Sequence, residues 1–166
     1  MDQSHPSDIS LDKVMTFRHP GLLLRVQKKY SWSPDQAEDV FQDMKRFLYL
    51  CAKNPSVTYA PPEKIDDCWH EFILFTLDYF KFCKDHLGRF IHHKPQTPGG
   101  GGDKKVIPRT VEAARAEFGQ NLSSIWYYPG FKVDAVGEDH ECDKCAGSTN
   151  CQSVSFVLGE DGKGKH

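Results

Sequence analysis

The sequence predicts a mainly α-helical fold: a compact, small helical bundle at residues 21–130, an N-terminal arm at 1–20, and an irregular, cysteine-containing tail at 131–166. Two long segments carry apolar residues three or four positions apart, the spacing of helices with one buried face. Hydrophobic residues make up 39% of the chain and charged residues 27%, a balance typical of a globular protein with a core. The tail has no such period, and only Val154–Leu158 is expected to form a short strand there.

Charge and hydropathy exclude several classes of protein. The net charge of −2 provides no basic field that would attract a nucleic acid. No run reaches the roughly 18 apolar residues of a membrane span, and the polar, acidic start of the chain is not a signal peptide. We therefore expect a cytoplasmic protein without membrane contact, whose partner is another protein. The six cysteines are then expected to be reduced or metal-bound thiols rather than disulfides.

The first long helix has clear signals at both ends. Ser33 is a good N-cap and Pro34 a good first helical residue, whereas Asn54-Pro55 ends the pattern. The apolar spacing between these signals predicts a helix over 35–52. Three shorter helical stretches are expected at 11–17, 21–30 and 110–118, the last of them capped by Thr110.

The second long helix is predicted over 65–87 and is the centre of the chain. At about 100° per residue, one broad face is expected to be buried: Ile65, Trp69, Phe72, Ile73, Thr76, Phe80, Cys83 and Leu87. The opposite face is expected in solvent: Asp67, Glu71, Asp78, Lys81 and Asp85. Gly88 is placed to end this helix, and 89–95 is expected to run extended. The glycines of the loop 97–105 are not followed by Gly-Lys-Ser/Thr, as a phosphate-binding loop would require.

Several residues of this region form a recognisable pattern. Asp66-x-x-Trp69-His70 is followed by Tyr79, Cys83, Gly88 and His93, and then by an FG…W…P pattern formed by Phe118-Gly119, Trp126 and Pro129. Over roughly residues 20–130, the pattern resembles the glycine-rich domain-containing protein-like family, which occurs in small bacterial and larger plant proteins. The resemblance implies a mostly helical fold. The tail lacks the long Gly/Cys repeats of some relatives, so the resemblance does not imply a function tied to those repeats.

Asp66, His70 and His93 form the first candidate metal site. Asp66 and His70 are four residues apart and therefore lie together at the edge between the two helix faces. His93 must reach back to His70 along the length of the helix. A straight helix from His70 to Leu87 is about 25 Å long, whereas the six extended residues that follow it cover about 20 Å. The side chains must cover the rest, and a break in the helix near 76–78 would make this easier. Two imidazoles and one carboxylate suit zinc with a water ligand, or non-haem iron. The alternative is that Asp66 serves only the helix dipole and the histidines only form hydrogen bonds.

The tail carries a second candidate site, His140-x-Cys142-x-x-Cys145-x5-Cys151. Two thiolates in a tight C-x-x-C turn can chelate one zinc ion, and Cys151 with His140 would complete a tetrahedral set. A single C-x-x-C is only half of a usual zinc site, so two other interpretations stay open. The thiols are either without a ligand or a redox pair, although the βαβ unit that usually carries such a pair is absent.

Other candidates are weaker. His92 is expected to face away from His93, because neighbours in an extended segment point to opposite sides. Cys51, Cys68 and Cys83 fall within the helical patterns, where a buried free cysteine is a common core residue.

Three functions remain open. The first is a small metal-binding helical domain, with zinc as its ion, that acts through protein–protein contacts. The second is a metal-dependent oxygenase or hydrolase centred on Asp66, His70 and His93, with Glu71 and Tyr79 nearest for acid–base work. The third is a purely structural interaction module in which the histidines only satisfy hydrogen bonds. The sequence holds no complete catalytic set, and it does not indicate the oligomeric state.

Overall fold

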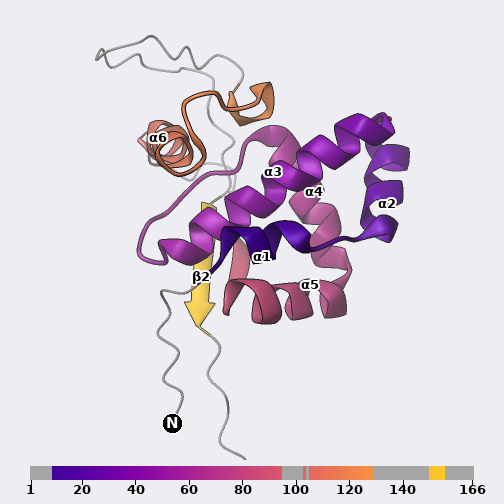
Figure 1. Cartoon of the computed structure of the whole chain (residues 1–166), viewed down its shortest axis with the longest axis horizontal. Helices are drawn as coiled ribbons and strands as arrows, with labels where there is room; N and C mark the ends of the chain where they lie inside the picture. Colours follow the sequence, from indigo (N-terminus) through magenta and orange to yellow (C-terminus); the bar gives the residue numbers. More distant parts are fainter. Residues whose placement is uncertain (1–8, 95–102, 104, 129–149, 156–166) are drawn as a thin grey trace, which may run out of the picture.

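The computed structural model of the chain describes residues 9–94, 103 and 105–128, together with the backbone of 150–155. These residues form a small, mainly helical fold, which confirms the predicted fold class (Figure 1). The elements in chain order are α1 (Leu11–Thr16), α2 (Pro20–Tyr30), α3 (Pro34–Lys53), α4 (Glu63–Leu74), α5 (Thr76–Phe82), the π-helix η1 (Cys83–Leu87), β1 (Arg89–Lys94), α6 (Val106–Phe118), the 3-10 helix η2 (Ser124–Trp126) and β2 (Asn150–Ser155).

Helix α3 is the scaffold on which the other elements pack. It contacts α1, α2, α4, α6 and both strands, and Figure 1 shows it between α6 and α5. Its start agrees with the sequence: the Ser33 side chain accepts a hydrogen bond from the Gln36 amide, and Pro34 is the first helical residue. Phe41 and Phe47 are completely buried on the inward face and form part of the main core.

The second predicted helix is broken at Phe75, next to the stretch 76–78 where a break would ease the return of His93, and the expectation of a single apolar face over 65–87 was wrong. Phe75 separates α4 from α5 with a non-helical backbone, φ −83° and ψ 62°. The break changes which residues face inward beyond it, because the 100° period no longer continues across position 75. Tyr79 and Phe82 are therefore buried, whereas Phe80, predicted in the core, is 45% exposed.

The same region contains three further differences in burial. Thr76, predicted to be buried, is exposed, and Ile73 is only partly buried. Glu71, predicted on the solvent face, is 1% exposed because α2 covers it. The 3.6-residue period locates an apolar face, but it does not show that a neighbouring helix also covers the polar side.

The chain after α5 turns back along the core. Gly88 ends the π-helix, at the position predicted for the helix end. Its φ of +66° is a left-handed conformation that glycine adopts without strain. The predicted extended segment then forms β1, which pairs antiparallel with β2. In this register His93 lies opposite Cys151. Strand β2 overlaps the predicted strand 154–158 only at its end.

Helix α6 belongs to a second, smaller apolar cluster. The expectation that Thr110 caps this helix was wrong, because the helix begins four residues earlier, at Val106. Thr110 is buried inside it; its hydroxyl donates to the Val106 carbonyl at 2.7 Å and accepts from the Ala60 amide at 3.0 Å. The Tyr128 hydroxyl also donates to the Ala60 carbonyl, so two hydroxyls fasten this cluster to the segment before α4.

The described cysteines are of two kinds. Cys51 is disulfide-bonded, so the expectation of a reduced or metal-bound thiol was wrong for this residue. Cys68 and Cys83 are free and buried in the core. Burial raises the pKa of the Cys68 thiol to about 12 and that of Cys83 to about 11, so both remain protonated at neutral pH. Within the stretches the structure describes, no helix combines the length and the apolar character needed to cross a bilayer.

Candidate metal site

Helix α4 and strand β1 bring Asp66, His70 and His93 together. Each residue offers one potential ligand atom, and these atoms all lie within 4.8 Å of one another. Asp66 and His70 lie one turn apart on α4, and the break at Phe75 lets the chain return so that β1 carries His93 to them. The structure thus brings His93 next to Asp66, which lies 27 positions earlier in the sequence.

Asp66 is the centre of the cluster. Its Oδ1 lies 2.7 Å from Nε2 of His93, and its Oδ2 lies 3.4 Å from Nδ1 of His70. The side chain of His93 is only 5% exposed, whereas that of His70 is 43% exposed. The cluster therefore has one side in the core and one side open to solvent, so that an ion and an added ligand can reach it.

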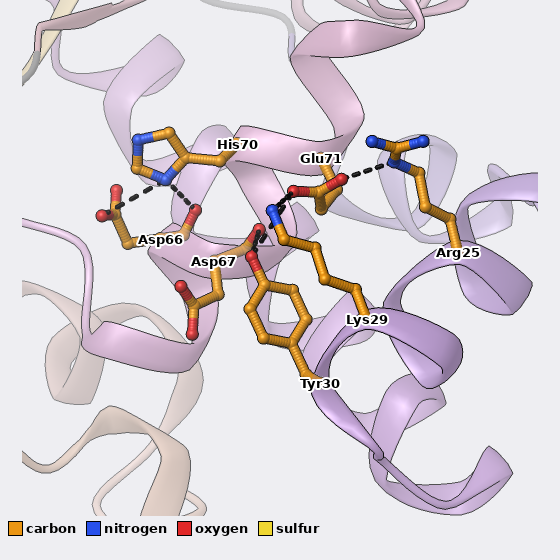
Figure 2. A network of polar contacts seen from close by, with 7 residues as sticks. All are labelled: Arg25, Lys29, Tyr30, Asp66, Asp67, His70 and Glu71. Carbon is orange, nitrogen blue, oxygen red and sulfur yellow. Dashed lines mark hydrogen bonds and ion pairs between the residues drawn. The ribbon is translucent and has the colours of Figure 1, made fainter.

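A backbone carbonyl fixes the tautomer of His70. Nδ1 of His70 lies 2.8 Å from the carbonyl oxygen of Asp66, and Figure 2 shows this one ring nitrogen directed at both the carbonyl and the carboxylate of Asp66. A carbonyl oxygen can only accept, so Nδ1 carries the proton and Nε2 keeps a lone pair. Metal-bound histidines characteristically donate their second N–H in this way.

Aromatic rings support the two histidines. The rings of His93 and Trp69 meet edge to face with centroids 4.5 Å apart, and the rings of His70 and His93 lie 4.2 Å apart. Trp69 is completely buried and precedes His70 on α4. The indole thus forms a rigid inner wall beside His93.

The remaining predicted ligands are not part of this cluster. His92 is exposed, and its ring packs edge to face on Phe90, 4.7 Å between centroids. His140, Cys142 and Cys145 lie outside the described residues, and only the backbone of Cys151 is described. The zinc site expected in the tail therefore stays a prediction.

A second polar network lies on the other side of α4. The buried carboxylate of Glu71 accepts hydrogen bonds from Arg25 and Lys29 of α2, and the Tyr30 hydroxyl lies 3.5 Å from it (Figure 2). Burial alone would raise the pKa of Glu71, but the hydrogen bonds from Lys29 and Arg25 lower it overall, so the carboxyl group is ionised at neutral pH. Sequence reasoning missed this network, whose only signal was two cations four residues apart on one helix.

The two residues expected nearest for acid–base work are not placed for it. Glu71 points to α2 and is occupied by two cations. Tyr79 is 2% exposed, and its hydroxyl accepts a hydrogen bond from Trp69 and donates one to the Ile91 carbonyl. Burial raises the pKa of Tyr79 well above its usual value, so its phenol does not ionise near neutral pH. Neither residue is therefore placed beside the cluster as a free acid or base.

The comparison with protein families gives a match. A family model, UCP032817-like, matches residues 11–100, which hold α1 to β1 and all three residues of the cluster. The comparison with curated proteins and that with solved structures yield no match. The expected membership of the glycine-rich domain-containing protein-like family was therefore wrong, since a different family model is the one that matches. Because the match spans more than half of the 166 residues, the chain belongs to the UCP032817-like family.

Proposed function

We propose that this domain binds one divalent transition-metal ion, zinc in the first place, through Asp66, His70 and His93. The observation that carries the proposal is the convergence of one carboxylate and two imidazoles within 4.8 Å. Zinc–nitrogen and zinc–oxygen distances of about 2.0–2.2 Å place neighbouring ligands of a tetrahedral ion about 3.3–3.6 Å apart. The side chains would need to close by about 1 Å around an ion, a movement within the reach of side-chain rotation.

The donor set suits an exchangeable site. Three protein ligands leave at least one coordination position for water or another ligand, and His70 faces solvent on that side. His93 can bind an ion through Nε2 only when that nitrogen carries no proton, and Asp66 binds as a carboxylate, so protons compete with the ion and binding weakens as the pH falls. The same two-histidine, one-carboxylate set also suits Fe(II), which is the alternative ion.

We further propose that the metal-loaded domain acts by contacting another protein in the cytoplasm. Exposed apolar side chains on α4 and α5 support a protein partner: Leu74 is 60% exposed, Leu77 is 70% exposed and Phe80 is 45% exposed. A metal-dependent enzyme is the second candidate, because the open coordination position could admit a substrate. The burial of Tyr79 and the ion pairs of Glu71 favour the binding function.

Elemental analysis of the purified full-length protein tests the proposal. The wild type should contain an equivalent of zinc or iron that His70→Ala lacks. His92→Ala is the matched control, because it removes an exposed imidazole from the same strand as His93 without touching the cluster. Equal metal content in the wild type and His70→Ala would contradict the proposal. Spectral change on adding oxygen to an iron-loaded protein would favour the enzyme over the binding domain.

A further inference from the structure

The hydroxyl of Tyr79 joins three elements at one point of the core. It accepts a hydrogen bond from the indole Nε1 of Trp69 at 3.0 Å and donates its own hydrogen to the carbonyl of Ile91. Trp69 belongs to α4, Tyr79 to α5 and Ile91 to β1. None of the three residues is more than 2% exposed, so water does not replace either hydrogen bond.

Both partners of this hydroxyl are next to the metal ligands. Ile91 and His93 are two residues apart on β1 and therefore point to the same side of the strand. Trp69 directly precedes His70, and its ring contacts the ring of His93. A hydroxyl that fixes the Ile91 carbonyl relative to the indole thus fixes how far β1 lies from α4.

The break at Phe75 makes such a fastening necessary. Helix α5 begins after a non-helical residue, so the backbone of α4 alone does not determine where α5 and β1 lie. Helix contacts hold the buried side of α5, but Asp66 lies on α4 and His93 on β1, 27 residues later in the sequence. The two hydrogen bonds of Tyr79 cross this gap with defined direction, which apolar packing does not supply.

We infer that Tyr79 is a positioning residue of the metal site: by bridging Trp69 and Ile91, its hydroxyl holds His93 at coordinating distance from Asp66 and His70. The inference rests on the proposed function and deepens it. Tyr79 does not touch the ion. Its effect passes through β1 and through the indole ring.

Tyr79→Phe tests this role, with Tyr128→Phe as the matched control. Each substitution removes one buried phenol that donates to a backbone carbonyl, but Tyr128 bonds to Ala60 in the smaller cluster around α6. Both variants should lose thermal stability. Only Tyr79→Phe should weaken the nuclear Overhauser effect between the ring protons of Trp69 and His93 in metal-free protein. Only Tyr79→Phe should lower the affinity for cobalt(II), by about tenfold or more, the size of effect typical of supporting residues around a metal.

The two readouts separate the inference from the proposed function. An unchanged Trp69–His93 contact together with unchanged cobalt affinity in Tyr79→Phe would overturn the inference. If the wild type itself binds no cobalt, the proposed function fails, while the contact in metal-free protein still decides whether Tyr79 positions His93.

A measurement on the wild type covers the case in which Tyr79→Phe does not fold. Zinc binding should slow hydrogen exchange of the Trp69 indole more than that of the Trp126 indole, which is equally buried but belongs to η2. Equal effects on the two indoles would contradict a link between the site and the Tyr79 hydroxyl.

Discussion

At the scale of single residues, Lys45 is a charged side chain placed inside the core. Its side chain is completely buried, and its ammonium donates to the carbonyls of Met15 and Phe17 at 2.9 and 3.0 Å. Burial, with a contribution from Arg18, lowers the pKa of Lys45 from 10.5 to about 8. The lysine thus holds the C-terminal end of α1 against α3, but its charge is unfavourable in the core.

The sign of this shift gives a pH dependence. The unfolded chain holds the lysine proton up to a pKa of 10.5 and the folded chain only to about 8, so the unfolded state binds more protons between these values. The free energy of unfolding contributed by Lys45 therefore rises as the pH increases through this window. A neutral amine still donates to both carbonyls, so the hydrogen bonds need not be lost.

We expect the wild type to gain stability relative to Lys45→Met as the pH rises from about 7 to about 10. Urea denaturation of both proteins at several pH values measures the difference. Because the two proteins share all other titrating groups, their contributions cancel. A difference in the free energy of unfolding that does not change with pH would show that the pKa of Lys45 is not lowered.

At the scale of elements, the break between α4 and α5 decides which aromatic residues form the core. Trp69 on α4 is completely buried, whereas Phe80 on α5 is 45% exposed. Trp69→Ala should lower the free energy of unfolding by about 3–5 kcal/mol, the range for a large buried aromatic side chain. Phe80→Ala should lower it by clearly less, because Phe80 is 45% exposed and its ring packs on Phe90 at the edge of the core. Chemical denaturation distinguishes the two, and a larger loss for Phe80→Ala than for Trp69→Ala would contradict this division of the core.

The contact between α2 and α4 depends on Glu71. Glu71→Gln should lower the free energy of unfolding at neutral pH by about 1–3 kcal/mol, because Arg25 and Lys29 lose a charged acceptor. The pKa of Glu71 is below 4.5 in the folded state, so its contribution is present above 4.5 and is lost as the pH falls through the lower, folded value. Glu63→Gln, at an exposed site on the same helix, is the control. Equal stability curves for the two variants would contradict a stabilising role for the network.

Some elements could be predicted from the sequence and others could not, for identifiable reasons. Helix α3 has a local cap, a proline at its first position and an unbroken apolar period, so its bounds follow from local chemistry. The break at Phe75 has no glycine or proline beside it, so no local breaker marks it in the sequence. Threonine is a residue type that often caps helices, but the Thr110 hydroxyl instead donates to the Val106 carbonyl within α6 and accepts from the Ala60 amide.

Part of the candidate site could likewise be predicted from the sequence, and part could not. The i,i+4 spacing brings Asp66 and His70 together, and the distance that an extended segment can return limits how His93 reaches them. The hydrogen bonds of Tyr79 and the cations around Glu71 join residues 10 to 46 positions apart in the sequence. No local pattern encodes such pairs, because they depend on how the helices pack.

At the scale of the whole molecule, the tail adds a second expected metal site to the domain. If Cys142 and Cys145 bind zinc, the double variant Cys142→Ser, Cys145→Ser should lose one equivalent of zinc and keep the metal bound at Asp66. Elemental analysis compares the metal content of the wild type, the double cysteine variant and His70→Ala. Each variant should contain one equivalent less than the wild type, because each lacks one of the two sites. Zinc content that the double variant leaves unchanged would remove the tail site from the account.

The family match and the cluster fall on the same part of the chain. Residues 11–100 carry the helices α1 to α5, the strand β1 and all three proposed ligands, while the tail lies beyond the match. The matched region therefore contains the complete proposed site. We expect metal binding to be a property of this helical unit, with the tail as an addition to it.

A crystal structure of the full-length protein grown with zinc, with anomalous data at the zinc edge, tests the central claim most directly. We expect one anomalous peak bound by the Asp66 carboxylate, His70 and His93, at about 2.0–2.2 Å from each ligand atom. His93 should have exchanged its hydrogen bond with Asp66 for a bond to the ion. Well-ordered density that shows Asp66 and His93 still bonded to each other, with no anomalous peak beside them, would contradict the claim.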